Sequence, residues 1–292
     1  MPETRPRRRP VGYAPGAGSR SSRVLNFIGL LVLAVVFLIP FYLIVRNALA
    51  TTEEITAPEW MWFPSRIQWS NLAELFGDPK VPMARSIWNS AVVAALTTAG
   101  TLFLCATAGY GLARIPNRFS NAVFYSILVT LMIPSAITFV PSFVMVSSLG
   151  WVGDLRGLII PTLFNGFVCF LCRQYFLGFP RELEEAARVD GLGHWGAFWR
   201  IVVPNSKGFM AAIGVITFVT SWNAFLWPLV IARGNPDAWT VQVALSTFLT
   251  AQTINLPQLF LAAGVGILPL VFVFLFFQRY LVQGVTQSGL KG

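Results

Sequence analysis

The stretch VLNFIGLLVLAVVFLIPFYLIV, from Val24 to Val45, contains no charged residue. A helix needs about 20 predominantly apolar residues to cross the hydrocarbon core of a bilayer, so this run predicts a membrane-spanning helix. A secretory signal peptide has a shorter apolar region and then a small-residue cleavage site, and this stretch fits neither criterion. We therefore expect the helix to remain in the protein as its first span.

Five further apolar runs predict five more spans, with boundaries uncertain by several residues. They are Ser86–Leu112, Ala122–Val146, Gly157–Leu177, Phe209–Ile231 and Leu259–Val282. The whole chain is 55% hydrophobic and 11% charged, whereas a soluble domain carries roughly 25% charged residues. The expected fold is an all-α, polytopic membrane helix bundle of six transmembrane helices that occupies residues 24–292. Prolines inside the third, fifth and sixth runs predict kinks in a bundle.

The basic residues predict how the chain is oriented. Six arginines lie within residues 1–23, a segment rich in Pro, Gly and Ser that we expect to be a disordered basic tail. With this tail in the cytoplasm, the cytoplasmic segments hold fifteen of the 21 lysines and arginines. That bias follows the positive-inside rule and predicts two cytoplasmic termini in a cytoplasmic (inner) membrane. Nucleic-acid binding is disfavoured because no folded reading module accompanies the tail.

Acidic residues and lysines are absent from all six apolar runs. A proton- or sodium-coupled carrier would place ionisable groups or ion sites near the bilayer midplane, and a membrane enzyme would cluster His, Asp or Glu at one face. Neither pattern occurs. No lysine follows a glycine either, so the chain lacks the phosphate-binding loop of an ATPase and is not expected to be an enzyme. The energy source is expected to lie outside this chain.

A different kind of segment connects the fourth and fifth runs: FPRELEEAARVDGLGHWGAFWRIVVP, Phe179 to Pro204. Pro180 and the glutamates after it suit the first turn of a helix, and Gly191 and Gly193 suit a sharp turn at its end. A second short helix follows, in which Trp195, Phe198, Trp199 and Val202 share one face. The segment predicts a rigid helix–turn–helix with this tryptophan-rich face packed inward and a charged face toward the cytosol.

Within this segment, Glu185-Ala186-Ala187, Gly191, Ile201 and Pro204 follow the pattern E-A-A-x3-G-x9-I-x-L-P, except for Val203 at the leucine position. This pattern resembles the EAA loop of ATP-binding-cassette (ABC) importer permeases. The resemblance implies the type I importer permease fold and a cytoplasmic coupling loop at residues 179–207, called the EAA loop below. It implies that ATPase coupling is carried by the following residues: Glu185, Ala186, Ala187, Asp190, Gly191, Ile201 and Pro204. An amphipathic surface loop of no special role is the alternative.

Two more stretches, Ser221–Ile231 and Phe276–Gly292, resemble carbohydrate-uptake permeases, in particular the partner permease of the maltose-importer type. The resemblance implies a second homologous permease, two ATPase subunits that use ATP and magnesium, and an extracytoplasmic sugar-binding protein as partners. This chain itself would bind no cofactor. The end of the chain, with Lys291 and Gly292, would reach the ATPase subunits. A frayed C-terminus is the alternative.

For each remaining candidate residue, an ordinary structural role is an alternative to the functional role. Trp222 and Asn223 could line a sugar pathway, or they could be an interfacial tryptophan and an interhelical hydrogen bond. His194 could contact the ATPase or be an ordinary surface histidine. Cys169 and Cys172 form a C-x-x-C without a second ligand pair, so together with Cys105 they are expected to be small packing residues, and no metal site is expected.

Overall fold

The computed structural model describes residues 20–249 and 254–289, and within these ranges it describes no side chains of residues 20, 21 and 281–289. The chain divides into two compact units, Met1–Ile44 and Val45–Gly292. In the first unit, α1 begins at Arg20, four residues before the expected start of the first span. Its side chains between Val24 and Phe41 are exposed around the whole helix, which suits a helix surrounded by lipid. The predicted disordered tail lies outside the described residues up to residue 19.

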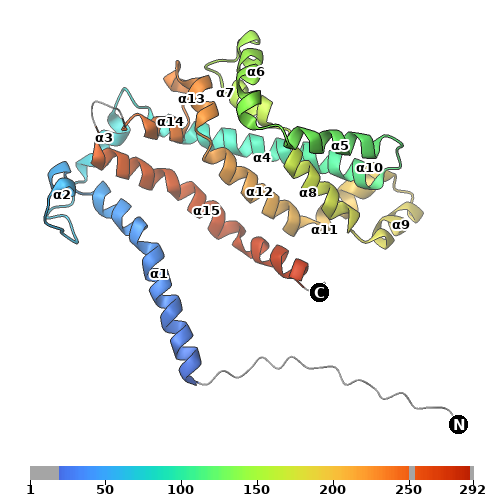
Figure 1. Ribbon diagram of the computed structural model, residues 1–292, viewed down its shortest axis with the longest axis horizontal. Helices are drawn as coiled ribbons and strands as arrows, with labels where there is room; N and C mark the ends of the chain where they lie inside the picture. Colours follow the sequence, from blue (N-terminus) through green and yellow to red (C-terminus); the bar gives the residue numbers. More distant parts are fainter. Residues whose placement is uncertain (1–19, 250–253, 290–292) are drawn as a thin grey trace. The chain divides into compact units, whose positions relative to one another are not determined.

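All regular elements in the described ranges are helices (Figure 1). In chain order they are α1 (Arg20–Ala48), α2 (Thr52–Thr56), α3 (Ser70–Gly77), α4 (Met83–Arg114), α5 (Ser120–Leu131), α6 (Ser135–Ser148), α7 (Leu155–Ile159), η1 (Ile160–Thr162), α8 (Gly166–Leu177), α9 (Arg181–Val189), α10 (His194–Ala197), η2 (Phe198–Val202), α11 (Val203–Asn205), α12 (Lys207–Trp222), α13 (Leu226–Ala232), η3 (Pro236–Ala238), α14 (Val241–Ser246) and α15 (Leu256–Gly289).

Helix α4 is the central element of the second unit. It packs most extensively on α8 and α12, and it also contacts α5, α7 and α14. Gly109 permits the close approach of α8, because a Cβ atom at this position would lie 2.6 Å from the Cβ of Cys172. Cys105, Cys169 and Cys172 are unpaired and fully buried in this interface. The expectation that the cysteines pack within the bundle is confirmed.

Four helices of the described ranges are long and apolar enough to cross a membrane, and the number rises to six if each of two bent pairs is one span. The predicted third span is such a pair, because α5 and α6 meet at 100°. Pro134 causes the break, since it lacks an N–H group and restricts the residue before it to extended backbone. The predicted fourth span corresponds to the candidate Leu155–Leu177, which is made of α7, η1 and α8.

The predicted fifth span, Phe209–Ile231, is wrong beyond Trp222. Helix α12 ends at Trp222 and a separate helix, α13, begins at Leu226. Pro228 contributes to this break, because in a continuous helix it would leave the carbonyl of Ala224 without its N–H donor. Helix α12 instead forms the second bent pair with residues 194–205, at an angle of 80°.

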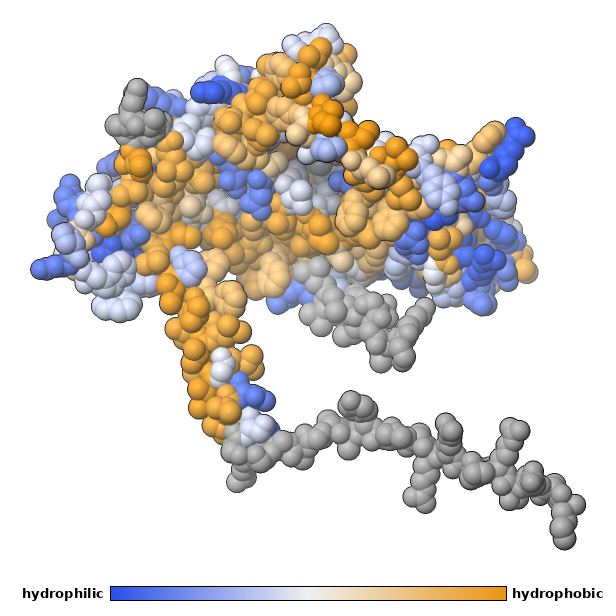
Figure 2. Space-filling view, in the orientation of Figure 1, coloured by the Kyte–Doolittle hydropathy of each residue, from blue (hydrophilic) through white to orange (hydrophobic). Residues whose placement is uncertain are grey.

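Apolar side chains cover most of the middle of the helical unit, and charged side chains gather at the end that carries α9 (Figure 2). Three buried clusters fill its interior. One of them, built around Tyr110, Phe176 and Phe198, lies directly beneath the EAA loop. The loop therefore stands on a packed base rather than on a flexible linker.

Candidate functional site

The first arm of the EAA loop is α9, whose ends are formed as the sequence predicts. Pro180 precedes its first residue, and Glu182 and Glu184 occupy its first turn. At the other end, the N–H of Leu192 donates to the carbonyl of Ala187 at 2.9 Å, and the N–H of Gly191 donates to that of Arg188 at 3.0 Å. These two bonds form a Schellman cap, and Gly191 adopts the positive φ of 83° that the cap requires. The sharp turn predicted at Gly191 is confirmed.

Helix α9 has one buried face and one exposed face. Glu184 and Ala187 are 4% and 3% exposed, whereas Glu185 and Ala186 lie on the exposed side. Glu184 therefore lies outside the charged face that was expected toward the cytosol. Ala187, assigned to ATPase coupling together with Ala186, packs against the base of the loop, so its small side chain permits close packing of α9 on its own protein.

Glu184 is the centre of a buried polar cluster that the sequence did not reveal. One of its carboxylate oxygens lies 3.2 Å from the Nε of Arg114, and both side chains are 6% exposed. The other carboxylate oxygen accepts a hydrogen bond of 3.0 Å from the hydroxyl of Tyr110. Arg114 also donates to the carbonyl of Phe179, just before α9. The sequence signal for the burial of Glu184 was its spacing from Ala187, because residues i and i+3 share a helix face.

The second arm runs through α10, η2 and α11 and differs from the single helix that was predicted. Phe198 and Val202 are buried as expected, but Trp195 is 61% exposed and Trp199 is 39% exposed. The residues of η2 form a π-helix, which has a wider turn than an α-helix and changes which side chains share a face. The predicted inward-facing tryptophan stripe is therefore wrong. Trp199 instead stacks on Phe103 of α4, with ring centroids 6.1 Å apart.

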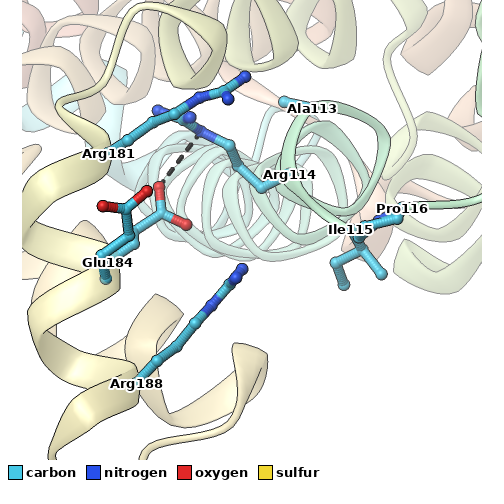
Figure 3. A pocket seen from close by; sticks show the side chains of 8 residues that line it. Ala113, Arg114, Ile115, Pro116, Arg181, Glu184 and Arg188 are labelled. Carbon is cyan, nitrogen blue, oxygen red and sulfur yellow. Dashed lines mark ion pairs between the residues drawn. The ribbon is translucent and has the colours of Figure 1, made fainter.

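A pocket of about 330 Å³ opens between α9 and the end of α4. Figure 3 shows Arg181 and Arg188 extending from α9 on either side of the Arg114–Glu184 ion pair. Ala113, Ile115 and Pro116 form the opposite wall. The pocket and the carboxylate it reaches occupy the junction between the EAA loop and the central helix.

The other residues assigned to coupling are distributed along the hairpin. Asp190 and Pro204 are exposed, and Ile201 is half-buried. His194 begins α10, and its Nδ1 lies 3.4 Å from a guanidinium nitrogen of Arg188, so it links the two arms. Lys291 and Gly292 lie outside the described residues. Within residues 20–249 and 254–289, no group of His, Cys, Asp and Glu residues is arranged to hold a metal ion.

The two candidates for a sugar pathway differ in exposure. Trp222 is 1% exposed, and its indole N–H donates to the carbonyl of Gly266 on α15 at 3.1 Å. Trp222 therefore packs between helices in this structure, and its role in a sugar pathway stays a prediction. Asn223 is exposed and accepts a hydrogen bond of 3.2 Å from Gln242, and its pathway role stays a prediction.

Known proteins share the sequence pattern and the architecture of this chain. The family model described as "Binding-protein-dependent transport system inner membrane component" matches residues 105–287. The chain is 31% identical to the arabinooligosaccharides transport system permease protein AraQ of Bacillus subtilis (strain 168), over 90% of this chain and 93% of that protein. It is 32% identical to the lactose transport system permease protein LacG of Rhizobium radiobacter, over 85% of this chain and 89% of that one.

The fold also matches a chain in the crystal structure of a bacterial ABC transporter involved in the import of the acidic polysaccharide alginate. The TM-score is 0.76 with 21% sequence identity, and the match covers 90% of this chain and 98% of that one. The predicted ABC importer permease fold is therefore confirmed. The chain belongs to the family of binding-protein-dependent transport system inner membrane components, the membrane-embedded permease subunits of ABC importers.

Proposed function

We propose that this chain is the permease subunit of an ATP-driven importer that carries a sugar or oligosaccharide across the cytoplasmic membrane. One observation carries the proposal: the EAA loop is a capped hairpin, fixed to the bundle on one side and exposed on the other. Its exposed surface includes Glu185 and Ala186, together with the apolar side chain of Val189, which is 89% exposed. A rigid, capped hairpin with one exposed face suits docking into a groove of another protein.

The proposed docking partner is one of two separate ATPase subunits, which use ATP and magnesium. This chain contributes no phosphate-binding loop, binds no cofactor and performs no hydrolysis. Its N-terminus, C-terminus and EAA loop face the cytoplasm, an orientation supported by the excess of arginine and lysine in those segments. A second homologous permease completes the pathway, and an extracytoplasmic binding protein delivers the cargo. The names of the arabinooligosaccharide and lactose relatives support a saccharide cargo.

In this proposal the bundle has two conformations, and the cytoplasmic ATPase subunits determine which of them is populated. Closure of the ATPase subunits on ATP moves the two EAA loops together and turns the cavity outward, and hydrolysis resets it. The bent pairs α5–α6 and α11–α12 suit such a device, because breaks between rigid segments allow rotation without loss of the packing within each segment.

Reconstitution of the complete complex in proteoliposomes tests the proposal. Uptake of radiolabelled arabinooligosaccharides and lactose is measured in the presence of the binding protein, with ATP or a non-hydrolysable analogue on the ATPase side. We expect saccharide uptake with ATP only, and none when the catalytic glutamate of the ATPase is replaced. Uptake driven by an ion gradient without ATP would contradict the energy source. ATP-dependent uptake of sn-glycerol 3-phosphate, the cargo named for another relative, with no saccharide uptake would contradict the cargo class.

A further inference from the structure

The buried cluster beneath the EAA loop is unusual in where it places its charges. Glu184 and Arg114 form an ion pair that is almost completely removed from solvent. A buried pair of this kind is on average no more stabilising than apolar residues of the same volume, whereas loss of one partner is costly. Its presence is therefore explained better by the geometry that it imposes than by stability. Apolar side chains can slide past one another, but a hydrogen-bonded carboxylate accepts few positions.

The position that is imposed is that of α9 relative to α4. The backbone of α9 packs closely on η2 and α10. Its link to α4 runs through long side chains, with Arg114 and Tyr110 reaching Glu184 from one helix turn of α4. Arg114 also holds the carbonyl of Phe179, so it grips both the entry to α9 and the first turn of the helix. The contact is small, directional and buried.

Tyr110 joins this polar link to the aromatic base of the loop. Its ring lies 4.8 Å from that of Phe198 in η2 and 5.8 Å from that of Phe176 in α8. Its hydroxyl donates to Glu184. One side chain of α4 therefore contacts both arms of the hairpin, and α4 is the helix on which the rest of the unit packs. A displacement of either arm is passed to the same turn of the central helix.

We infer that Tyr110, Arg114 and Glu184 form a positioning relay that makes the EAA loop and α4 move as one body. The inference rests on the proposed function, because it concerns how a movement of the loop reaches the transport pathway. The three residues touch neither cargo nor nucleotide; they act through the helix that they hold. Without the relay, the loop would still dock on the ATPase, but part of its movement would be absorbed between α9 and α4.

The decisive quantity is the number of saccharide molecules imported per ATP hydrolysed by the reconstituted complex. A defect of folding or assembly lowers both rates together, whereas a broken relay lowers their ratio. We expect Glu184→Gln, which removes the carboxylate charge, to lower the ratio by about tenfold. Glu182→Gln changes an exposed acid on the same helix and is expected to leave the ratio unchanged.

Tyr110→Phe provides a milder test in case Glu184→Gln does not assemble. It removes only the hydroxyl, keeps the ring in the aromatic cluster, and is expected to lower the ratio by about threefold. Tyr175→Phe, in a neighbouring aromatic pair with Phe209, is the matched control with an unchanged ratio. Wild-type ratios in both Tyr110→Phe and Glu184→Gln would overturn the relay while leaving the proposed importer intact.

A second measurement needs no partner protein and separates the relay from the proposed function. The three native cysteines are fully buried, so thiols introduced by Val189→Cys on α9 and Ile115→Cys after α4 can be spin-labelled selectively. We expect a narrow distribution of distances between the two labels in the otherwise unchanged chain and in Glu182→Gln. A broad distribution is expected in Tyr110→Phe and Glu184→Gln. Equal widths in all four proteins would overturn the relay, even if the chain proved not to be an importer subunit.

Discussion

The turn at Gly191 allows the sharpest prediction about the EAA loop. Gly191 has a φ of 83°, and a Cβ atom built on it would meet nothing within 4 Å. A substitution by alanine is therefore opposed by the backbone alone, at a cost of roughly 1–2 kcal/mol for an L-residue in the left-handed region. If the free loop relieves this strain by opening the turn, the docking-competent conformation becomes about 5- to 30-fold less populated.

The expected result of Gly191→Ala is a dissociation constant for the ATPase that rises by about the same 5- to 30-fold, because docking must first restore the turn. Gly193→Ala is the matched control. Its φ is −71° and its Cβ also meets nothing within 4 Å, so we expect no change. Gly191→Asn should lie between the two, since asparagine tolerates the left-handed region better than alanine. Titration of fluorescently labelled ATPase onto the permease pair in nanodiscs measures all three. Equal affinities for Gly191→Ala and Gly193→Ala would show that the left-handed turn at Gly191 does not limit docking.

Three further predictions concern stability and are measured by thermal unfolding of the purified protein. Gly109→Ala should destabilise the interface between α4 and α8 by about 1–3 kcal/mol, because its Cβ has no room. Gly111→Ala, whose Cβ would meet nothing within 4 Å, should leave the stability unchanged. Equal losses of stability in the two variants would contradict this prediction. Hydrogen bonds from the Ser65 hydroxyl and N–H hold the pKa of Glu54 below its ordinary value of 4.5. Ser65→Ala should therefore destabilise the protein at about pH 6, and the loss should shrink as the pH falls below 4.5. A loss of stability that does not depend on pH would contradict this prediction. Trp222→Phe should lower the stability by about 1 kcal/mol, because it loses the hydrogen bond to Gly266. The KM for saccharide uptake should stay unchanged. A large rise in this KM would indicate that Trp222 contacts the sugar.

Local chemistry explains which features the sequence predicted well. The start of α9 after Pro180 and its end before Gly191 depend on the residues at the cap itself, and both agree with the structure. The apolar runs likewise predicted the long helices α4 and α15, because a continuous run is sufficient to make a spanning helix. These features needed no knowledge of the neighbouring helices.

The features that were missed depend on contacts between distant segments. From the sequence alone, Glu184 is expected to be a solvated acid. Its burial depends on Arg114 and Tyr110 of α4, which lie 70 and 74 residues away along the chain. Trp195 is 61% exposed, and the arm that carries it continues into a π-helical turn, which the hydrophobic pattern of the sequence does not distinguish from an α-helical one. The break after Trp222 lies inside an apolar run whose composition does not distinguish one long helix from two short ones.

We propose that the exposed face of the EAA loop docks on a cytoplasmic ATPase. Site-specific cross-linking in inverted membrane vesicles tests this docking, with Glu185→Cys as the reporter and a short reagent that joins a thiol to an amine. We expect Glu185→Cys to cross-link to the ATPase subunit, and Lys80→Cys, placed on the predicted outer side, to give no such product. A reporter at Glu185 that is labelled only from the extracytoplasmic side, or that cross-links to no ATPase in an assembled complex, would exclude this face as the docking surface.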